Sequence, residues 1–284
     1  MKHETYEFMA KDNLPLFYQI WHAENEKGLV CLIHGLGEHG GCYGTMAEYL
    51  AKKGYSLAAL DLRGHGRSKG KRGHAASYEL LMDDIDSFIS RASAGYSNLP
   101  CFLYGHSMGG NLVLNYCLRY KTGLAGVIAS GPWLRLVTEP PRYKYLLSRL
   151  LNALYPSLTM NNGLKSDTLY HSESKTEDYY KDPLFHSLIS ARLYTVIRAS
   201  GLWALEHAGV LGLPSLVMHG SEDRVTSPGA STEFSKKAPG STLKIWDGFY
   251  HVLQNEPRHD DVFRYVAEWI EAHVTTIQSS KYEV

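Results

Sequence analysis

The feature that most constrains this chain is a serine between two glycines, at the junction of an apolar segment and a helical one. Residues 105–109 are Gly105-His106-Ser107-Met108-Gly109, a G-x-S-x-G pattern. Residues 99–104 predict a short strand before it, and the apolar spacing after it predicts a helix ending near residue 119. A serine hydroxyl is a poor nucleophile unless it is exposed, close to a base and faced by oxyanion donors, and a sharp strand-to-helix turn presents it in this way. Ser107 is therefore a candidate nucleophile; the alternative is a glycine-rich turn whose serine does nothing.

The composition is typical of a soluble globular protein. The 284 residues are 44% hydrophobic and 20% charged, which allows one large α/β domain or two small ones. Lys plus Arg (29) equal Asp plus Glu (29), so no overall charge favours a nucleic-acid partner. The four cysteines are irregularly spaced, which favours reduced thiols over a disulfide framework. We expect no nucleic-acid partner; the pattern indicates no oligomeric state.

Two segments bear on location. Residues 1–7 contain no apolar run, so we expect no signal peptide. Residues 92–118 contain no charged side chain, but Pro100, several asparagines and glycines interrupt them, which a membrane span would not tolerate well. We therefore expect a soluble, cytoplasmic protein.

Strand and helix patterns alternate along most of the chain. Strands are predicted at 5–10, 14–22, 29–33, 55–60, 99–104, 125–130, 213–219 and 242–246, and helices at 45–53, 78–89, 110–119, 229–237 and around 262–274. Such alternation is typical of a mostly parallel sheet with helices on both faces. We expect an α/β fold with a central sheet of about eight strands.

After Trp133 the alternation stops for about seventy residues, too long for an ordinary connection. We expect a helical cap at residues 132–206, inserted after the sixth strand, and a core made of 1–131 and 207–284. One cap helix is predicted at 191–204. Another has an apolar stripe of Tyr143, Leu146, Leu147, Leu150, Leu151 and Leu154 among Arg142, Lys144 and Arg149. The stripe fits an acyl tunnel, a lipid surface, or plain packing on the core.

A serine nucleophile needs a histidine base and an acid that holds the histidine's tautomer. Where the serine lies on such a turn, the acid and then the histidine follow it in the chain. Asp223 follows the strand at 213–219, and His251 follows the strand at 242–246. Both lie at the carboxyl edge of a parallel sheet, where ligands bind. The weaker rivals, which we expect at the surface or in turns, are Glu222, Asp247, His259 and His273.

The oxyanion of the reaction needs backbone donors. The N–H of the residue after the nucleophile, Met108, is one. We expect the other from Leu36, in the loop after the strand at 29–33, because Gly35 and Gly37 let that loop approach a substrate.

Five motifs resemble the monoacylglycerol lipase branch of the α/β-hydrolase superfamily. They are His34-Gly35-x-Gly37-Glu38-His39, Asp61-x-x-Gly64-His65-Gly66-x-Ser68-x-Gly70, Gly105-His106-Ser107-Met108-Gly109-Gly110, Gly220-Ser221-x-Asp223-Arg224 and Tyr250-His251-Val252-Leu253. The similarity runs from about residue 14 to 274, with the cap matched only loosely through Lys181-Asp182-Pro183-Leu184.

This resemblance implies an α/β-hydrolase fold, the triad Ser107, Asp223 and His251, and oxyanion donors Leu36 and Met108. It also implies a small lipid or ester substrate, and in particular hydrolysis of monoacylglycerols to fatty acid and glycerol. The alternatives are a lysophospholipase or general carboxylesterase, and an aminopeptidase-like serine hydrolase. One departure is Cys42, where the branch usually has arginine before the tyrosine.

Three other classes compete with this interpretation. Residues 35–40 match G-x-G-x-x-G after a strand, which alone would indicate dinucleotide binding. The side chains of His34, His39, Asp61 and His65 have metal-ligand chemistry, although hydrogen bonds that shape their loops explain them better. An inactive hydrolase used as a binding module is the third. We expect no cofactor and no metal, because the complete triad favours serine chemistry.

Overall fold

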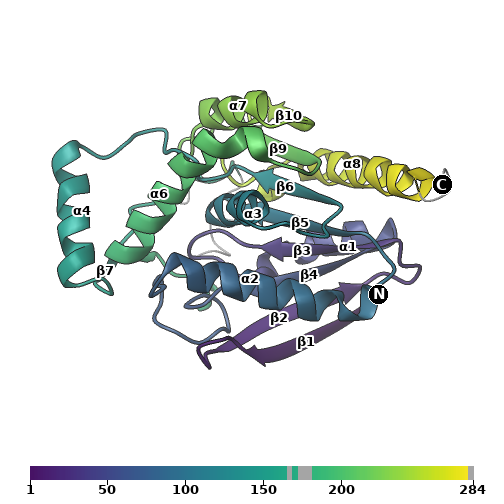
Figure 1. Cartoon of the computed structure of the whole chain (residues 1–284), viewed down its shortest axis with the longest axis horizontal. Coiled ribbons are helices and arrows are strands. Elements are labelled where there is room, and N and C mark those ends of the chain that lie inside the picture. Colours follow the sequence, from purple (N-terminus) through teal and green to yellow (C-terminus); the bar gives the residue numbers. More distant parts are fainter. Residues whose placement is uncertain (165–167, 172–180, 281–284) are drawn as a thin grey trace.

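The strand before the serine, β5 (Cys101–His106), lies in the middle of an eight-stranded sheet (Figure 1). The computed structural model describes residues 1–164, 168–171 and 181–280. The sheet order is β1-β2-β4-β3-β5-β6-β9-β10, in which β2 is antiparallel to β1 and β4 and the remaining neighbours are parallel. Its other strands are β1 (Lys2–Met9), β2 (Pro15–His22), β3 (Gly28–Ile33), β4 (Tyr55–Asp61), β6 (Gly126–Ser130), β9 (Ser215–Gly220) and β10 (Ser241–Trp246). The expected eight-stranded, mostly parallel α/β-hydrolase fold is confirmed.

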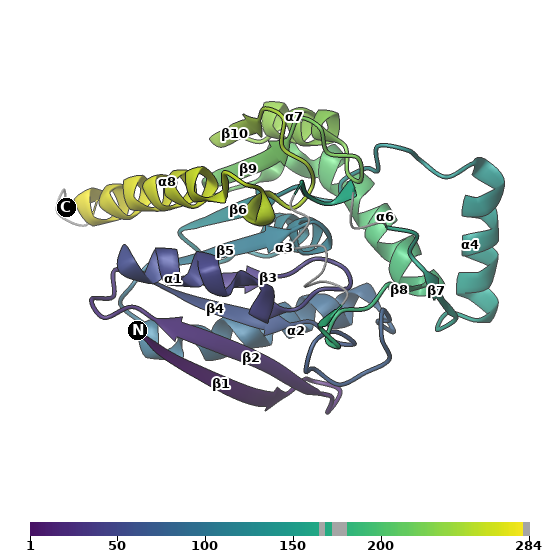
Figure 2. The same ribbon diagram turned by 180° about the vertical axis from the view of Figure 1, so that it is seen from behind.

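Helices cover both faces of this sheet (Figures 1 and 2). Side chains alternate along β3, so that Leu29, Cys31 and Ile33 face one layer and Val30 and Leu32 the other. The first layer contains α2 (Tyr78–Ala92), α3 (Met108–Arg119), α6 (Ala191–His207) and α7 (Pro228–Lys237); the second contains α1 (Gly44–Lys52) and α8 (His259–Ser280). Short 3₁₀ turns lie at Gly40–Tyr43, Ser93–Tyr96, Ala208–Val210 and Leu253–Asn255. Burial on both faces explains why the central strands are apolar throughout.

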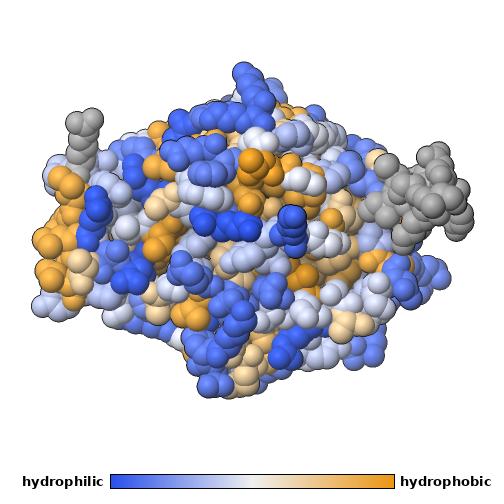
Figure 3. Space-filling view, in the orientation of Figure 1, coloured by the Kyte–Doolittle hydropathy of each residue, from blue (hydrophilic) through white to orange (hydrophobic). Residues whose placement is uncertain are grey.

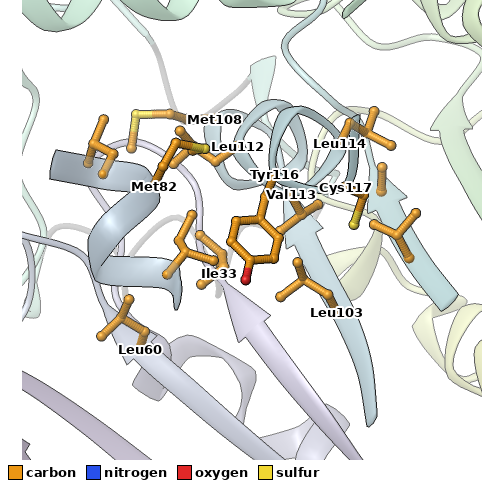
Figure 4. Packing of buried hydrophobic residues seen from close by; sticks show 14 of the residues in the cluster. Ile33, Leu60, Met82, Leu103, Met108, Leu112, Val113, Leu114, Tyr116 and Cys117 are labelled. Carbon is orange, nitrogen blue, oxygen red and sulfur yellow. The ribbon is translucent and has the colours of Figure 1, made fainter. Parts of the chain in front are cut away.

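Helix α3 is anchored against the sheet by the apolar side chains that follow the serine. Figure 4 shows Met108, Leu112 and Val113 gathered with Ile33 and Leu103, and all five side chains are fully buried. Burying a side chain of this size stabilises the fold by about 1.5–3 kcal/mol relative to exposure. The start of α3 is therefore fixed on the strands that carry the site.

The turn at Ser107 requires both glycines of the motif. A Cβ atom at Gly105 would lie 2.3 Å from the carbonyl oxygen of Gly109. Ser107 itself has φ 53° and ψ −114°, a backbone conformation that costs a residue other than glycine about 1–3 kcal/mol. The packing of β5 and α3 on either side holds that conformation.

The segment between β6 and β9 contains more than the expected helices. Helix α4 (Arg142–Leu154) and helix α6 match the predicted ones, and the strands β7 (Thr159–Asn161) and β8 (Leu188–Ser190) form an antiparallel pair that the sequence pattern did not predict. Helix α6 packs directly on α3: Asn111 Nδ2 donates to the carbonyl of Ile197 at 3.0 Å. Residues 165–167 and 172–180 of the expected cap lie outside the described part. The division of the chain into core and cap remains a proposal.

Helix α4 carries its apolar stripe on the outside. Leu146, Leu150 and Leu154 are 55–62% exposed, and Tyr143 and Leu147 are exposed as well. Figures 1 and 2 place α4 at one end of the molecule, and Figure 3 shows apolar side chains gathered there. Packing on the core is therefore wrong for these five side chains. Among the described helices, none is both long and apolar enough to span a bilayer.

Candidate active site

Ser107, Asp223 and His251 lie together in one hydrogen-bonded line. His251 Nε2 is 2.9 Å from Ser107 Oγ, and His251 Nδ1 is 2.7 Å from Asp223 Oδ2. All three residues are buried. They come from three turns at one edge of the sheet, after β5, β9 and β10. The sequence-predicted residues are thus brought together in the order that a nucleophile, a base and an acid require.

A close backbone approach holds the loops after β9 and β10 side by side. A Cβ atom at Gly220, the last residue of β9, would lie 2.2 Å from the carbonyl oxygen of Tyr250. The amide of Glu222 donates to the carbonyl of Phe249 at 3.0 Å, next to the start of the acid's turn. The spacing between Asp223 and His251 therefore depends on backbone as well as on side chains.

The Asp223 carboxylate is held at both oxygens. Oδ1 accepts the amides of Val225 at 2.7 Å and Thr226 at 3.0 Å, while Oδ2 faces His251 and also His219 Nε2 at 2.9 Å. Burial acts to raise the pKa of this carboxyl, but the charge of His251 and the hydrogen bonds from His219 and His251 outweigh it and hold the pKa below its ordinary value. Asp223 is therefore an anion at neutral pH.

The rival residues lie elsewhere. The side chain of Glu222 is exposed, and Asp247 is exposed at a turn, 3.4 Å from the Ser221 hydroxyl. His259 and His273 are half-buried and bond through Nδ1 to backbone carbonyls near or within their own helix. Neither histidine reaches the serine.

The two expected oxyanion donors flank the serine. Met108 is the first residue of α3, so its N–H has no acceptor within the helix. The loop that carries Leu36 touches the turn: a Cβ atom at Gly35 would lie 3.2 Å from Ser107 Cβ. The Met108 N–H thus lies beside Ser107 without a helical acceptor, and the loop that carries Leu36 approaches the same turn. A developing oxyanion needs donors of this kind.

A cavity of 640 Å³ opens above the serine. Its wall includes Ser107 and His251, polar residues of the loop after β3, and apolar residues from β6 onward. The apolar group is Trp133, Leu136, Leu164, Leu169, Phe185, Ile189, Val225 and Val252. No residue of α4 is among the described residues that line it, so the acyl-tunnel interpretation of the α4 stripe is wrong for this cavity.

Glu38 and Cys42 line the same cavity. Glu38 Oε1 accepts the Gly35 amide at 2.5 Å and the Tyr43 hydroxyl at 2.7 Å. Burial raises the pKa of the Glu38 carboxyl, and it raises the pKa of the Cys42 thiol well above the ordinary value. At neutral pH Cys42 therefore presents an uncharged thiol to the cavity.

The histidine-rich loops hydrogen-bond to backbone. His34 Nδ1 donates to the Gly35 carbonyl at 2.7 Å, and His34 Nε2 accepts the Leu62 amide at 3.0 Å. Asp61 accepts the amides of Gly40 and Arg67. No cluster of three metal-ligating side chains occurs in the part of the chain that the structure describes. These side chains shape the loops beside the serine.

The family model described as Hydrolase_4, serine aminopeptidase, S33, matches residues 24–258. The chain belongs to this α/β-hydrolase family. A monoacylglycerol lipase of Mycolicibacterium smegmatis is 29% identical over 94% of this chain and 96% of its own length. The phospholipase YtpA of Bacillus subtilis is 30% identical over 86% of this chain and 95% of its own length. The chain spans 26% of the length of another relative, an uncharacterized abhydrolase domain-containing protein of Dictyostelium discoideum.

Solved structures agree with this assignment. The crystal structure of a monoacylglycerol lipase from Paleococcus ferrophilus superposes with a TM-score of 0.84 at 33% identity, over 91% of this chain and 99% of that one. The chain is thus a serine hydrolase of the lipase and esterase branch.

Three residues of this hydrolase's site were missed by sequence reasoning. His219 lies inside the apolar pattern of β9, Thr226 follows the acid by three residues, and His106 precedes the serine. Thr226 Oγ1 is 2.9 Å from Asp223 Oδ2, and the His106 ring lies 4.9 Å from the His251 ring. The sequence signal that could have identified His219 is its position four residues before Asp223, near the end of the predicted strand.

Proposed function

We propose that this hydrolase cleaves monoacylglycerols to free fatty acid and glycerol, with Ser107 as nucleophile, His251 as base and Asp223 as its acid partner. The observation that carries the proposal is the Ser107–His251–Asp223 line, at hydrogen-bond distances, whose Ser107 and His251 lie on the wall of a 640 Å³ cavity with a large apolar lining. The relatives named as monoacylglycerol lipases support the substrate class.

The chemistry follows from the positions of these atoms. Ser107 Oγ attacks the ester carbonyl while His251 Nε2 takes its proton, and Asp223 stabilises the imidazolium. The N–H groups of Leu36 and Met108 stabilise the oxyanion, and His251 returns the proton to the leaving alcohol. Water then attacks the acyl-enzyme, with His251 again as base, and releases the fatty acid.

The cavity wall favours an ester with one apolar arm. Each methylene that an acyl chain buries against residues such as Leu164, Leu169 and Val252 contributes about 0.8 kcal/mol before losses. We therefore expect medium to long acyl chains to be preferred until the cavity is filled. Triacylglycerols, with three acyl arms, fit a single cavity of this size poorly.

Two alternatives stand beside this substrate. The relative named as a phospholipase supports hydrolysis of lysophospholipids or of simple esters. The family description supports an aminopeptidase, which needs an acid for the peptide's ammonium group. Among the residues that the structure describes, both acids on the cavity wall are engaged: Asp182 lies 3.0 Å from His39 Nε2, and Glu38 accepts the Tyr43 hydroxyl. These contacts favour an ester over a peptide.

A side-by-side assay tests the choice. Monoacylglycerols of increasing chain length, lysophospholipids, p-nitrophenyl esters and aminoacyl anilides are compared by kcat/KM. We expect the monoacylglycerols to be turned over fastest among natural substrates, with kcat/KM rising with chain length. Faster turnover of lysophospholipids would move the assignment to that alternative, and faster turnover of anilides than of any ester would overturn ester hydrolysis.

We also propose that α4 contacts a lipid surface during substrate uptake. Its exposed leucines stand beside the exposed Lys144 and Arg149, and residues 142–154 contain no acidic side chain. An amphipathic helix of this kind favours an anionic lipid interface.

A further inference from the structure

A second histidine faces the far side of the acid. His219, fully buried at the end of β9, lies with Nε2 2.9 Å from Asp223 Oδ2, the oxygen that also faces His251. The same Nε2 is 3.1 Å from the carbonyl oxygen of Thr226. Because both of these groups are acceptors, Nε2 of His219 carries a hydrogen and donates it. Asp223 Oδ2 is thus shared between two imidazole donors.

The other ring nitrogen of His219 is fixed as well. Its Nδ1 lies 2.7 Å from the hydroxyl of Ser231, a fully buried residue of α7. A serine hydroxyl both donates and accepts, so it satisfies Nδ1 and holds the ring in its plane. The hydrogen-bonded line therefore continues beyond the acid: Ser107, His251, Asp223, His219, Ser231.

We propose that His219, held by Ser231, is a positioning residue that aligns the Asp223 carboxylate and limits how strongly it binds protonated His251. This inference rests on the proposed roles of Ser107, His251 and Asp223. His219 does not line the cavity, so it acts through the acid and not on the substrate.

The physical basis is competition at one oxygen. A donor to an ionised carboxylate stabilises the anion and makes it less basic. With His219 in place, Oδ2 attracts the His251 proton less strongly than it would with His251 as its only ring donor. Thr226 does not replace the missing donor fully, because its single hydroxyl proton has two acceptors, Gly131 O at 3.0 Å and Asp223 Oδ2 at 2.9 Å.

Two consequences distinguish this role from simple packing. Without the donor, Asp223 binds protonated His251 more tightly, so the acid limb of kcat/KM moves to higher pH. The carboxylate also loses a fixed partner, so kcat falls while KM stays near its wild-type value. Within the described part of the chain, the other titratable side chains that interact with Asp223 or His251 are His219, His106 and Glu38, and only His219 is changed in the test.

The experiment compares His219→Leu, which removes the donor, with His219→Gln, whose amide N–H replaces it. Steady-state kinetics with a soluble p-nitrophenyl ester are measured from pH 5 to 9, alongside thermal unfolding. We expect His219→Leu to lose about tenfold to hundredfold in kcat, with an acid limb shifted upward. His219→Gln should recover most of that loss and restore the limb.

A matched serine pair gives a second measurement that does not depend on the folding of His219→Leu. Ser231→Ala removes the hydroxyl on His219 Nδ1, whereas Ser215→Ala removes an equally buried hydroxyl of β9 that has no hydrogen-bond partner among the described residues. We expect Ser231→Ala to lower kcat and shift the acid limb in the same direction as His219→Leu, and Ser215→Ala to leave both unchanged.

A wild-type pH profile in both His219→Leu and Ser231→Ala would overturn the inference. Equal damage in the Gln and Leu variants at equal stability would overturn it too, because packing alone would then explain the loss. Ser107→Ala is assayed in parallel. If Ser107→Ala is inactive and the His219 variants behave like the wild type, only the positioning role is rejected. If Ser107→Ala is active, the proposed function and this inference are rejected together.

Discussion

Gly109 lies against the end of β3 so closely that a Cβ atom on it would stand 2.1 Å from the carbonyl oxygen of Ile33. The turn that carries Ser107 thus packs directly against the end of β3, and the loop that follows β3 carries Leu36. Nucleophile and oxyanion loop are placed by the same contact. Gly109, the last glycine of the motif, therefore places Ser107 relative to the oxyanion loop as well as allowing the turn to fold.

Replacing this glycine is the first prediction. In Gly109→Ala, backbone must move at either Ile33 or the serine turn, and overpacking of this kind costs about 1–3 kcal/mol. We expect a lower melting temperature together with a lower kcat, measured by thermal unfolding and ester hydrolysis. The matched control is Gly123→Ala, where a Cβ atom meets nothing within 4 Å, so it should change neither. Wild-type kcat in a folded Gly109→Ala would contradict the coupling.

The nucleophile is tested by removing one oxygen. Ser107→Ala should lose on the order of 10⁶ in kcat and keep its fold, because the hydroxyl makes the bond to the acyl group. Labelling by a serine-reactive phosphonate, followed by mass spectrometry, should mark Ser107 in the wild type and nothing in the variant. Retention of even a tenth of the activity would exclude Ser107 as nucleophile.

Asp223→Asn should cost about 10⁴ in rate. The asparagine oxygen can keep the amides of Val225 and Thr226, which turns its NH₂ toward His251 Nδ1. His251 then accepts at Nδ1 and carries its hydrogen on Nε2, where it cannot take the proton of Ser107. The exposed Asp247 serves as the control, and Asp247→Ala should retain nearly full activity. The reverse result would assign the acid to Asp247.

The three site residues were predictable because each of them lies in the turn or loop that follows a strand the sequence marks clearly. β5, β9 and β10 are short apolar runs, and residues at the carboxyl ends of parallel strands meet at one edge. His219 was not predictable in the same way, since its position inside β9 is explained by a buried strand alone. The strands β7 and β8 are three residues each, too short for periodicity to reveal. The apolar stripe of α4 could be predicted from its helical spacing, but that spacing does not determine whether the stripe faces the core or the outside.

Acid should weaken the fold through its buried histidines. Burial lowers the pKa of His34 to about 3 and that of His186 to about 4, whereas an unfolded histidine titrates near 6.5. Between these values the unfolded chain binds more protons, so the free energy of unfolding falls as the pH is lowered from about 6.5. Protonating His34 Nε2 also breaks its hydrogen bond from the Leu62 amide, 3.0 Å long.

The measurement is the pH dependence of urea unfolding between pH 6.5 and 4.5. One such histidine contributes up to about 1.4 kcal/mol per pH unit in this window. His34→Gln keeps a donor and an acceptor but removes the titration, so its slope against pH should be shallower by about that amount. The same slope in wild type and variant would show that His34 is not a source of the acid sensitivity.

The last prediction concerns α4 and anionic vesicles. Leu146 is 62% exposed and Leu150 is 55% exposed. The double variant Leu146→Ser with Leu150→Ser removes both apolar side chains, and α4 then loses their contact with the lipid interface. Because the burial of a leucine side chain contributes about 1.5–3 kcal/mol when complete, we expect partitioning into vesicles of phosphatidylserine and phosphatidylcholine to fall by at least about tenfold. Hydrolysis of a soluble p-nitrophenyl ester should be unchanged, since neither leucine lines the cavity.

Val210→Ser is the matched control, because Val210 is 69% exposed but lies outside the expected cap. Equal vesicle binding by the wild type, the control and the double variant would show that α4 is not the lipid-facing surface.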